Sequence, residues 1–272
     1  MTISLTISLS LLLFALAFPY LAGPVLVRYR PGVKAHQRFV LISDKAARLR
    51  FPPQSFSVIS QLEALGFSIV AHLASGDEIT KVNSMLSLLV NRDSRAAAIV
   101  GRAFVSKRNA NAVIEFVAFS TEFDDGSEIV TSNSPVVNVF REVSHRLRLS
   151  IPQLKDPSRL YYIHSHYVTS RVDCKPVLVE AGEEIEHFRA SHKKALSEQA
   201  ALGYYYLDET TERYRHSCAA SSRRHRLSER ILNWSSAILT TWRLLWPVKQ
   251  VLMLCKARRG RLIARAAGIT SL

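Results

Sequence analysis

Apolar residues in the stretch 51–134 recur first with the period of a helix and then with the period of strands. Helical spacing runs from Phe56 to Leu65, and Gly66 stands where such a helix would end. Four apolar runs follow, separated by the polar segments GDE, RDS and KRNAN; the runs are FSIVAHL, SMLSLLV, AAIVGRAFV and NAVIEFVAF. This pattern predicts one helix followed by a sheet of short strands.

The stretch AVIEFVAFSTEFDDGSEIVTSN predicts a β-hairpin, because Asp125 and Gly126 are residues that accept the positive φ angles of a tight turn. A calcium-binding loop is the alternative for these acidic residues. Such a loop needs oxygen ligands two and four residues before Asp125 and a Glu six residues after Gly126. Phe123 and Ser132 fail this requirement. We therefore interpret Asp125 and Gly126 as a structural turn.

A second helix is predicted after Asp156 and Pro157, which are a capping acid and a first-turn proline. Apolar residues between 160 and 168 then fall on one helical face. A helix places His164 and His166 about 200° apart, so the two imidazoles cannot share a metal ion.

A third helix is predicted over residues 182–202, before Gly203, and GYYYLDETTERYRH is expected to form a hairpin with its turn at residues 208–211. The spacing Glu184-x-x-His187 occurs in di-iron bundles, but only one copy is present, so it is interpreted as a solvated acidic face. The predicted fold class is α+β: an N-terminal transmembrane helix, a small antiparallel sheet packed with helices, and a C-terminal amphipathic helix.

The transmembrane part of this prediction rests on residues 3–27, which contain no charged residue. About 20 apolar residues are needed to span a bilayer as a helix. Basic residues follow the segment and none precede it, which favours a single-pass anchor with a cytoplasmic body at the inner or plasma membrane. A cleaved signal peptide is the alternative, although Met1 and Thr2 supply no basic n-region.

The net charge of +14 lies at the flanks of the chain. Residues 213–272 hold thirteen Lys and Arg against one acid, a net charge of +12, and residues 28–38 hold four basic residues and no acid. The residues between them are close to neutral, with nineteen basic and twenty-one acidic residues. Two basic flanks around a neutral body are more typical of contact with one anionic membrane surface than of a nucleic-acid-binding domain.

The stretch RILNWSSAILTTWRLLWPVKQVLMLCKARRGR predicts an amphipathic helix over about residues 231–246 that lies in the membrane plane, with Pro247 kinking or ending it. A second membrane span and a helix packed on the body remain alternatives. The residues predicted to contact the membrane surface are Arg28, Arg30, Lys34, Arg223, Arg224, Arg226, Arg230, Trp234, Trp242, Trp246, Lys256, Arg258, Arg259 and Arg261.

Catalytic and cofactor-binding motifs are absent from the sequence: it contains no GxGxxG, Walker A, GxSxG or HExxH. The three cysteines are too few and too scattered for a disulfide framework. No cofactor is predicted, and we expect a non-enzyme. An enzyme alternative would need a pocket of polar residues drawn from His145, His164, Glu115 and Glu122, and a nucleic-acid binder is the other alternative.

Four segments, TEFDDGSEIVTSNS, DPSRLYYIHSHYV, GYYYLDETTERYRH and TTWRLLWPVKQ, resemble a family of uncharacterised bacterial membrane-anchored proteins. The resemblance covers most of residues 1–260 and implies an anchor, a small α+β domain and a Trp-rich basic tail, but no activity. The family usually has a tryptophan where this chain has Cys218 or Ala219.

The predicted organisation has four consecutive parts. These are an anchor (1–27), a basic juxtamembrane linker (28–50), an α+β cytoplasmic domain (51–215) and a basic Trp-rich amphipathic tail (216–272). The predicted function is a membrane-anchored interaction or regulatory module. Its expected partners are anionic lipid and a membrane protein, with no nucleic acid.

Overall fold

The computed structural model of the chain describes residues 11, 14, 17–23, 32–35, 39–77, 82–107, 110–136, 142–216, 241 and 248–269. The chain divides into two compact units that are interleaved along the sequence. The larger unit comprises Gln37–Val136, Glu142–Ser191 and Leu254–Leu272, and the smaller unit comprises Met1–His36, Val137–Arg141 and His192–Met253. Each unit has its own sheet and its own buried cluster of apolar side chains.

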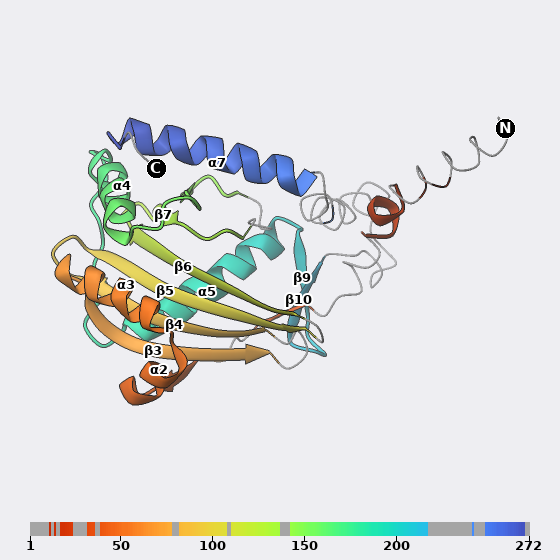
Figure 1. Ribbon diagram of the computed structural model, residues 1–272, viewed down its shortest axis with the longest axis horizontal. Helices are drawn as coiled ribbons and strands as arrows, with labels where there is room; N and C mark the ends of the chain where they lie inside the picture. The colour runs from red at the N-terminus through yellow and green to blue at the C-terminus, as the bar shows by residue number, and fades with distance from the viewer. Residues whose placement is uncertain are drawn as a thin grey trace. The chain divides into compact units, whose positions relative to one another are not determined.

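A seven-stranded sheet is the main element of the larger unit (Figure 1). Its strands lie side by side in the order in which they follow one another along the chain. Neighbouring strands are antiparallel except for the last pair, in which β8 runs parallel to β7. The strands are β2 (Val40–Ile42), β3 (Ser68–Asp77), β4 (Val82–Asn91), β5 (Ala96–Lys107), β6 (Ala110–Glu122), β7 (Glu128–Ser132) and β8 (Arg146–Ser150).

The helices of this unit begin and end at clear sequence signals. The Ser43 side chain accepts a hydrogen bond from the Ala46 N–H at the start of α2 (Asp44–Arg50). The carboxylate of Asp156 accepts two backbone hydrogen bonds at the start of α4 (Pro157–Thr169). Between them in the chain, α3 (Pro53–Ala64) ends just before Gly66, whose φ of +88° is accessible mainly to glycine. The predicted helices at 56–65 and after Asp156 are thereby confirmed.

The main core lies on one face of the sheet. Phe119 and Leu89 lie on this face and belong to one cluster of buried side chains. The helical residues of this cluster are Ile59 and Leu62 from α3, Leu160 and Ile163 from α4, and Ile263 and Ala264 from α7 (Val248–Ala266). On the opposite face, Ile185 and Phe188 from the start of α5 (Glu184–Ala201) pack on Phe39, Leu73 and Leu86.

Gly101 and Phe116 form a matched pair on neighbouring strands β5 and β6. A Cβ atom at position 101 would lie 2.3 Å from the Cζ of Phe116, far inside van der Waals contact. The phenylalanine ring therefore occupies the space that any larger residue at position 101 would need.

The smaller unit contains a three-stranded sheet with the order β1 (Val33–Lys34), β10 (Arg213–His216) and β9 (Tyr205–Asp208). Strands β9 and β10 are the predicted hairpin. Its buried cluster consists of Ala35, Leu196, Tyr204, Tyr205 and Tyr214.

The predicted N-terminal transmembrane helix is wrong as a part of the fold. Among the residues that the structure describes, no helix combines the length and the apolar character that crossing a bilayer requires. The apolar segment 3–27 contains Pro19, Gly23 and Pro24, and proline and glycine are the weakest helix formers.

Two further details differ from the sequence-based expectation. The sheet has seven strands and one parallel pair, whereas a small antiparallel sheet was predicted. The predicted in-plane helix at 231–246 lies outside the described residues apart from Thr241. The described C-terminal helix, α7, begins at Val248, directly after Pro247.

Candidate functional site

Helix α7 carries six basic residues and no acidic one along Val248–Ala266. At about 100° per residue, Gly260, Ile263, Ala264 and Ala267 fall on one side of the helix axis, and all four are buried. Gly260 fits closely, because a Cβ there would lie 3.3 Å from both the Ile151 Cγ2 and the Ser150 carbonyl oxygen. The small and apolar residues of α7 therefore hold it against the core of the larger unit.

Lys256 also faces this unit, and its ammonium group binds backbone carbonyl oxygens of the unit. Its Nζ donates hydrogen bonds to the carbonyl oxygens of Val136 (2.8 Å) and Ser134 (3.3 Å). Burial lowers the pKa of Lys256, because it penalises the charged ammonium. Lys256 therefore fixes the backbone after β7.

The opposite side of α7 forms the candidate site, which we call the outward stripe: Leu254, Arg258, Arg261, Leu262 and Arg265. All five side chains are exposed, Leu254 by 70% and Leu262 by 57%. Leu254 and the three arginines fall within an arc of roughly 60°, with Leu262 beside it. In the described part of the chain, none of the three arginines forms a salt bridge.

The residues that the sequence predicted for membrane contact lie in different parts of the structure. Arg258 and Arg261 lie on the outward stripe, together with Arg265, which the sequence-based set omitted. Arg259 lies beside the stripe, 4.0 Å from the exposed carboxylate of Glu142, and Lys256 faces the core. Lys34 lies on β1 in the smaller unit. The remaining predicted residues, Arg28, Arg30, Arg223, Arg224, Arg226, Arg230, Trp234, Trp242 and Trp246, lie outside the described residues.

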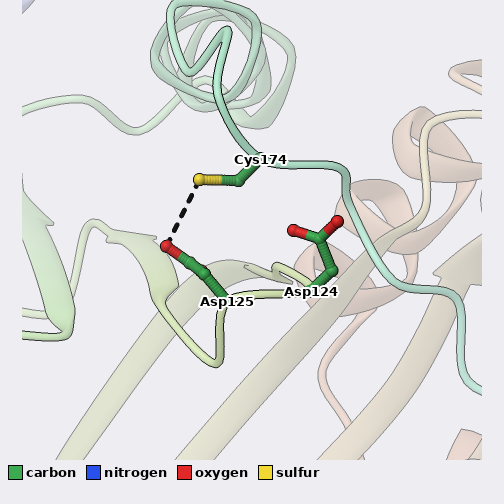
Figure 2. Close-up of side chains that lie close together, drawn as sticks. All are labelled: Asp124, Asp125 and Cys174. Carbon is green, nitrogen blue, oxygen red and sulfur yellow. Dashed lines mark hydrogen bonds between the residues drawn. The ribbon is translucent and has the colours of Figure 1, made fainter.

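A second cluster of polar side chains surrounds the turn between β6 and β7. Gly126 has a φ of +76°, while Asp125 is not among the described residues with positive φ. Instead, the Asp125 Oδ1 accepts the Ser127 N–H (2.8 Å). The Asp125 Oδ2 accepts the thiol of Cys174 (3.2 Å), as Figure 2 shows. Hydrogen bonds from the side chain and backbone of Ser127 and from Cys174 lower the pKa of Asp125 to about 2. The same thiol–carboxylate contact raises the pKa of Cys174.

Asp124, Asp125 and Cys174 have potential ligand atoms within 4.8 Å of one another. Their contacts have a structural explanation. The Asp124 N–H donates to the Lys175 carbonyl (3.0 Å), the Lys175 N–H donates to the Asp124 Oδ1 (3.1 Å), and Arg171 lies 3.7 Å from Asp125. These contacts attach the segment after α4 to the hairpin turn, so we assign no metal to the cluster.

A serine–histidine–aspartate contact that the sequence did not reveal joins α2 to the sheet. His72 Nδ1 lies 2.8 Å from the Ser87 Oγ, and His72 Nε2 lies 2.8 Å from the Asp44 Oδ1. Ser87 is fully buried and His72 is 4% exposed, so no substrate reaches the hydroxyl. In a hydrolase triad the serine also faces Nε2 and not Nδ1. We therefore interpret this contact as an attachment for α2.

The polar residues of the enzyme alternative do not form a pocket. His164 is enclosed on α4, where its two ring nitrogens lie 3.0 Å from the hydroxyls of Thr121 and Thr131. Burial lowers its pKa to about 4. Glu115 pairs with Arg102 across the strands (3.2 Å), whereas Glu122 projects from the other face of β6. His145 precedes β8 and is partly buried.

The interpretation of Glu184 as part of a solvated acidic face is wrong. Glu184 is buried, pairs with Arg92 and accepts the Gly182 N–H (2.7 Å) at the start of α5. His187 pairs with Glu122 (3.2 Å), which also accepts a hydrogen bond from Ser191. Arg92, which pairs with Glu184, and Glu122, which pairs with His187, lie far from α5 in the sequence, so no local pattern indicated these pairs.

Comparison with protein-family models, with curated proteins and with solved structures found no match to this chain. The resemblance to membrane-anchored proteins therefore stays a prediction.

Proposed function

We propose that this protein is an interaction module that binds an anionic membrane surface through the outward stripe of α7. The observation that carries the proposal is the contrast between the two sides of one helix. One side is buried in the core of the larger unit, and the other exposes three arginines without salt bridges in the described part of the chain, together with two leucines.

The expected energy comes mainly from charge. Each basic residue close to an anionic bilayer contributes about 1 kcal/mol, so the three arginines supply roughly 3 kcal/mol. The two leucines add apolar surface that is removed from water when the helix contacts the membrane interface. A change of roughly 3 kcal/mol corresponds to an affinity change of about 100-fold.

A membrane fits the stripe better than a single-stranded nucleic acid does. Both partners are anionic, but single-strand binding uses aromatic side chains on which bases stack. Helix α7 has no aromatic residue along Val248–Ala266 and instead exposes Leu254 and Leu262. Exposed aliphatic side chains among arginines favour the headgroup region of a bilayer.

The test is co-sedimentation of the full chain with vesicles of phosphatidylcholine, with and without phosphatidylglycerol, at low and raised salt. The test variant is R258A/R261A/R265A. The control variant, R48A/R50A/R159A, removes the same charge from exposed positions on α2 and α4. We expect the test variant to lose about 100-fold in affinity for the anionic vesicles and the control to lose little.

Equal loss in both variants would show that net charge alone drives binding and would contradict a site on α7. A single-stranded RNA added as competitor provides the second arm. Displacement of the protein from vesicles by RNA at low concentration, with RNA binding lost in the test variant, would assign the stripe to nucleic acid instead.

A further inference from the structure

We propose that the outward stripe recognises phosphate groups of lipid headgroups through paired hydrogen bonds from its guanidinium groups, and not through positive charge alone. This inference rests on the proposed function, because it names the chemical group that the membrane-binding site would take. The lipids concerned are those that present an accessible phosphate, with phosphatidic acid as the simplest example.

The spacing of the three arginines is the first argument. Arg258, Arg261 and Arg265 follow one another at intervals of three and four residues, so they form a row about 10 Å long on one side of the helix. Each guanidinium is a planar fork of N–H donors that matches two oxygens of one phosphate. A row of such forks can engage several headgroups at once while the helix lies in the membrane plane.

The availability of the guanidinium N–H donors also supports phosphate binding. Other arginines of the larger unit use their donors on carboxylates: Arg146 pairs with Glu128, and Arg92 pairs with Glu184. In the described part of the chain, no carboxylate lies within salt-bridge distance of the three stripe arginines. Their forks face solvent and remain available to an external oxyanion.

The two kinds of basic residue on this part of α7 also have different environments. The distinction is positional: Lys256 is turned inward onto two carbonyl oxygens, which an ammonium group satisfies. The forked donors are on the outward side, where a lysine would supply the same charge but only a point contact.

The experiment compares the full chain with two triple variants at Arg258, Arg261 and Arg265, one to lysine and one to alanine. Three vesicle types carry equal surface charge in a phosphatidylcholine background: phosphatidic acid, phosphatidylglycerol, and a carboxylate amphiphile such as oleate. We expect R258K/R261K/R265K to bind phosphatidic acid vesicles about tenfold more weakly than the unmodified chain, a change of about 1.4 kcal/mol. Its binding to oleate vesicles should be nearly unchanged.

The outcomes separate the two proposals. If the lysine variant binds all vesicles as the unmodified chain does, while the alanine variant does not bind, phosphate recognition is wrong and charge-driven membrane binding stands. If the alanine variant binds as well as the unmodified chain, the proposed function itself is wrong. A further arm adds inorganic phosphate: competition at equal phosphate concentration would show that the site takes the free ion instead of a headgroup.

Discussion

Helices α4 and α7 contribute to the same buried cluster, but they place polar side chains in opposite environments. On α4, His164 is buried and both ring nitrogens contact threonine hydroxyls. On α7, one lysine is used internally and three arginines face solvent. A buried polar group whose partners lie within the chain is explained by the fold. Exposed donors without an internal partner are the groups that can serve an external ligand.

The largest effect on the free energy of unfolding is expected when a buried leucine of α4 is compared with an exposed leucine of α7. Leu160→Ala on α4 removes a side chain with no exposed surface, and we expect a loss of about 2–5 kcal/mol in the free energy of unfolding. Leu262→Ala on α7 should change it by less than about 0.5 kcal/mol. Urea denaturation of both variants checks this, and similar losses would mean that Leu262 is covered in solution.

The next effect concerns pH and His164. The pKa of His164 falls from 6.5 to about 4 on burial, so between these values only the unfolded chain binds the proton. Lowering the pH from 6.5 to 4 should therefore reduce the free energy of unfolding by roughly 3 kcal/mol. In His164→Gln this part of the pH dependence should disappear. The matched control is His166→Gln, at the exposed histidine of the same helix; if it flattens the curve equally, the assignment to His164 fails.

A smaller effect is expected from the inward basic residue of α7. Lys256→Met keeps much of the side-chain length but removes two hydrogen bonds to backbone carbonyls. Hydrogen bonds to charged groups contribute about 1.5–3 kcal/mol, so a loss at the lower end of this range is expected in thermal denaturation. Arg258→Met is the comparison variant and should leave the midpoint unchanged.

The smallest effect on stability should come from the outward stripe. Each of Arg258→Ala, Arg261→Ala and Arg265→Ala should change the free energy of unfolding by no more than about 0.5 kcal/mol, because none of these side chains has a salt bridge in the part of the chain described. Urea denaturation measures this, and vesicle binding measured on the same preparations should fall with each substitution. A large loss of stability would show that these arginines are structural.

Local signals in the sequence were sufficient for most elements of the larger unit. Asp156 and Pro157 indicated the start of α4, Gly66 indicated the end of α3, and apolar runs indicated β3 to β6. Strand β8 was not predicted. Its sequence RLRLS is short, and no local pattern in the sequence indicates that it pairs in parallel with β7. The N-terminal apolar segment was long enough for a span by composition, but no helix among the described residues is both long and apolar enough to cross a bilayer.

The candidate site was only partly predictable for a similar reason. Charge along the sequence indicated that the C-terminal region is basic, and Arg258 and Arg261 were selected on that ground. Which side of α7 is buried depends on how Gly260 and Ile263 fit against residues more than 100 positions earlier in the chain. The inward contacts of Lys256 and the outward position of Arg265 follow from that packing, so the sequence alone did not indicate them. The contact between Asp44 and His72 was hidden in the same way.

The close fit of Gly101 and Phe116 has a consequence for sequence variation. A larger residue at position 101 is tolerated only if the ring at position 116 becomes smaller, because both compete for one volume. The effects of substitutions at the two positions are therefore not additive. Among proteins that share this sheet, positions 101 and 116 should change together, as a pair of small and large side chains in either order.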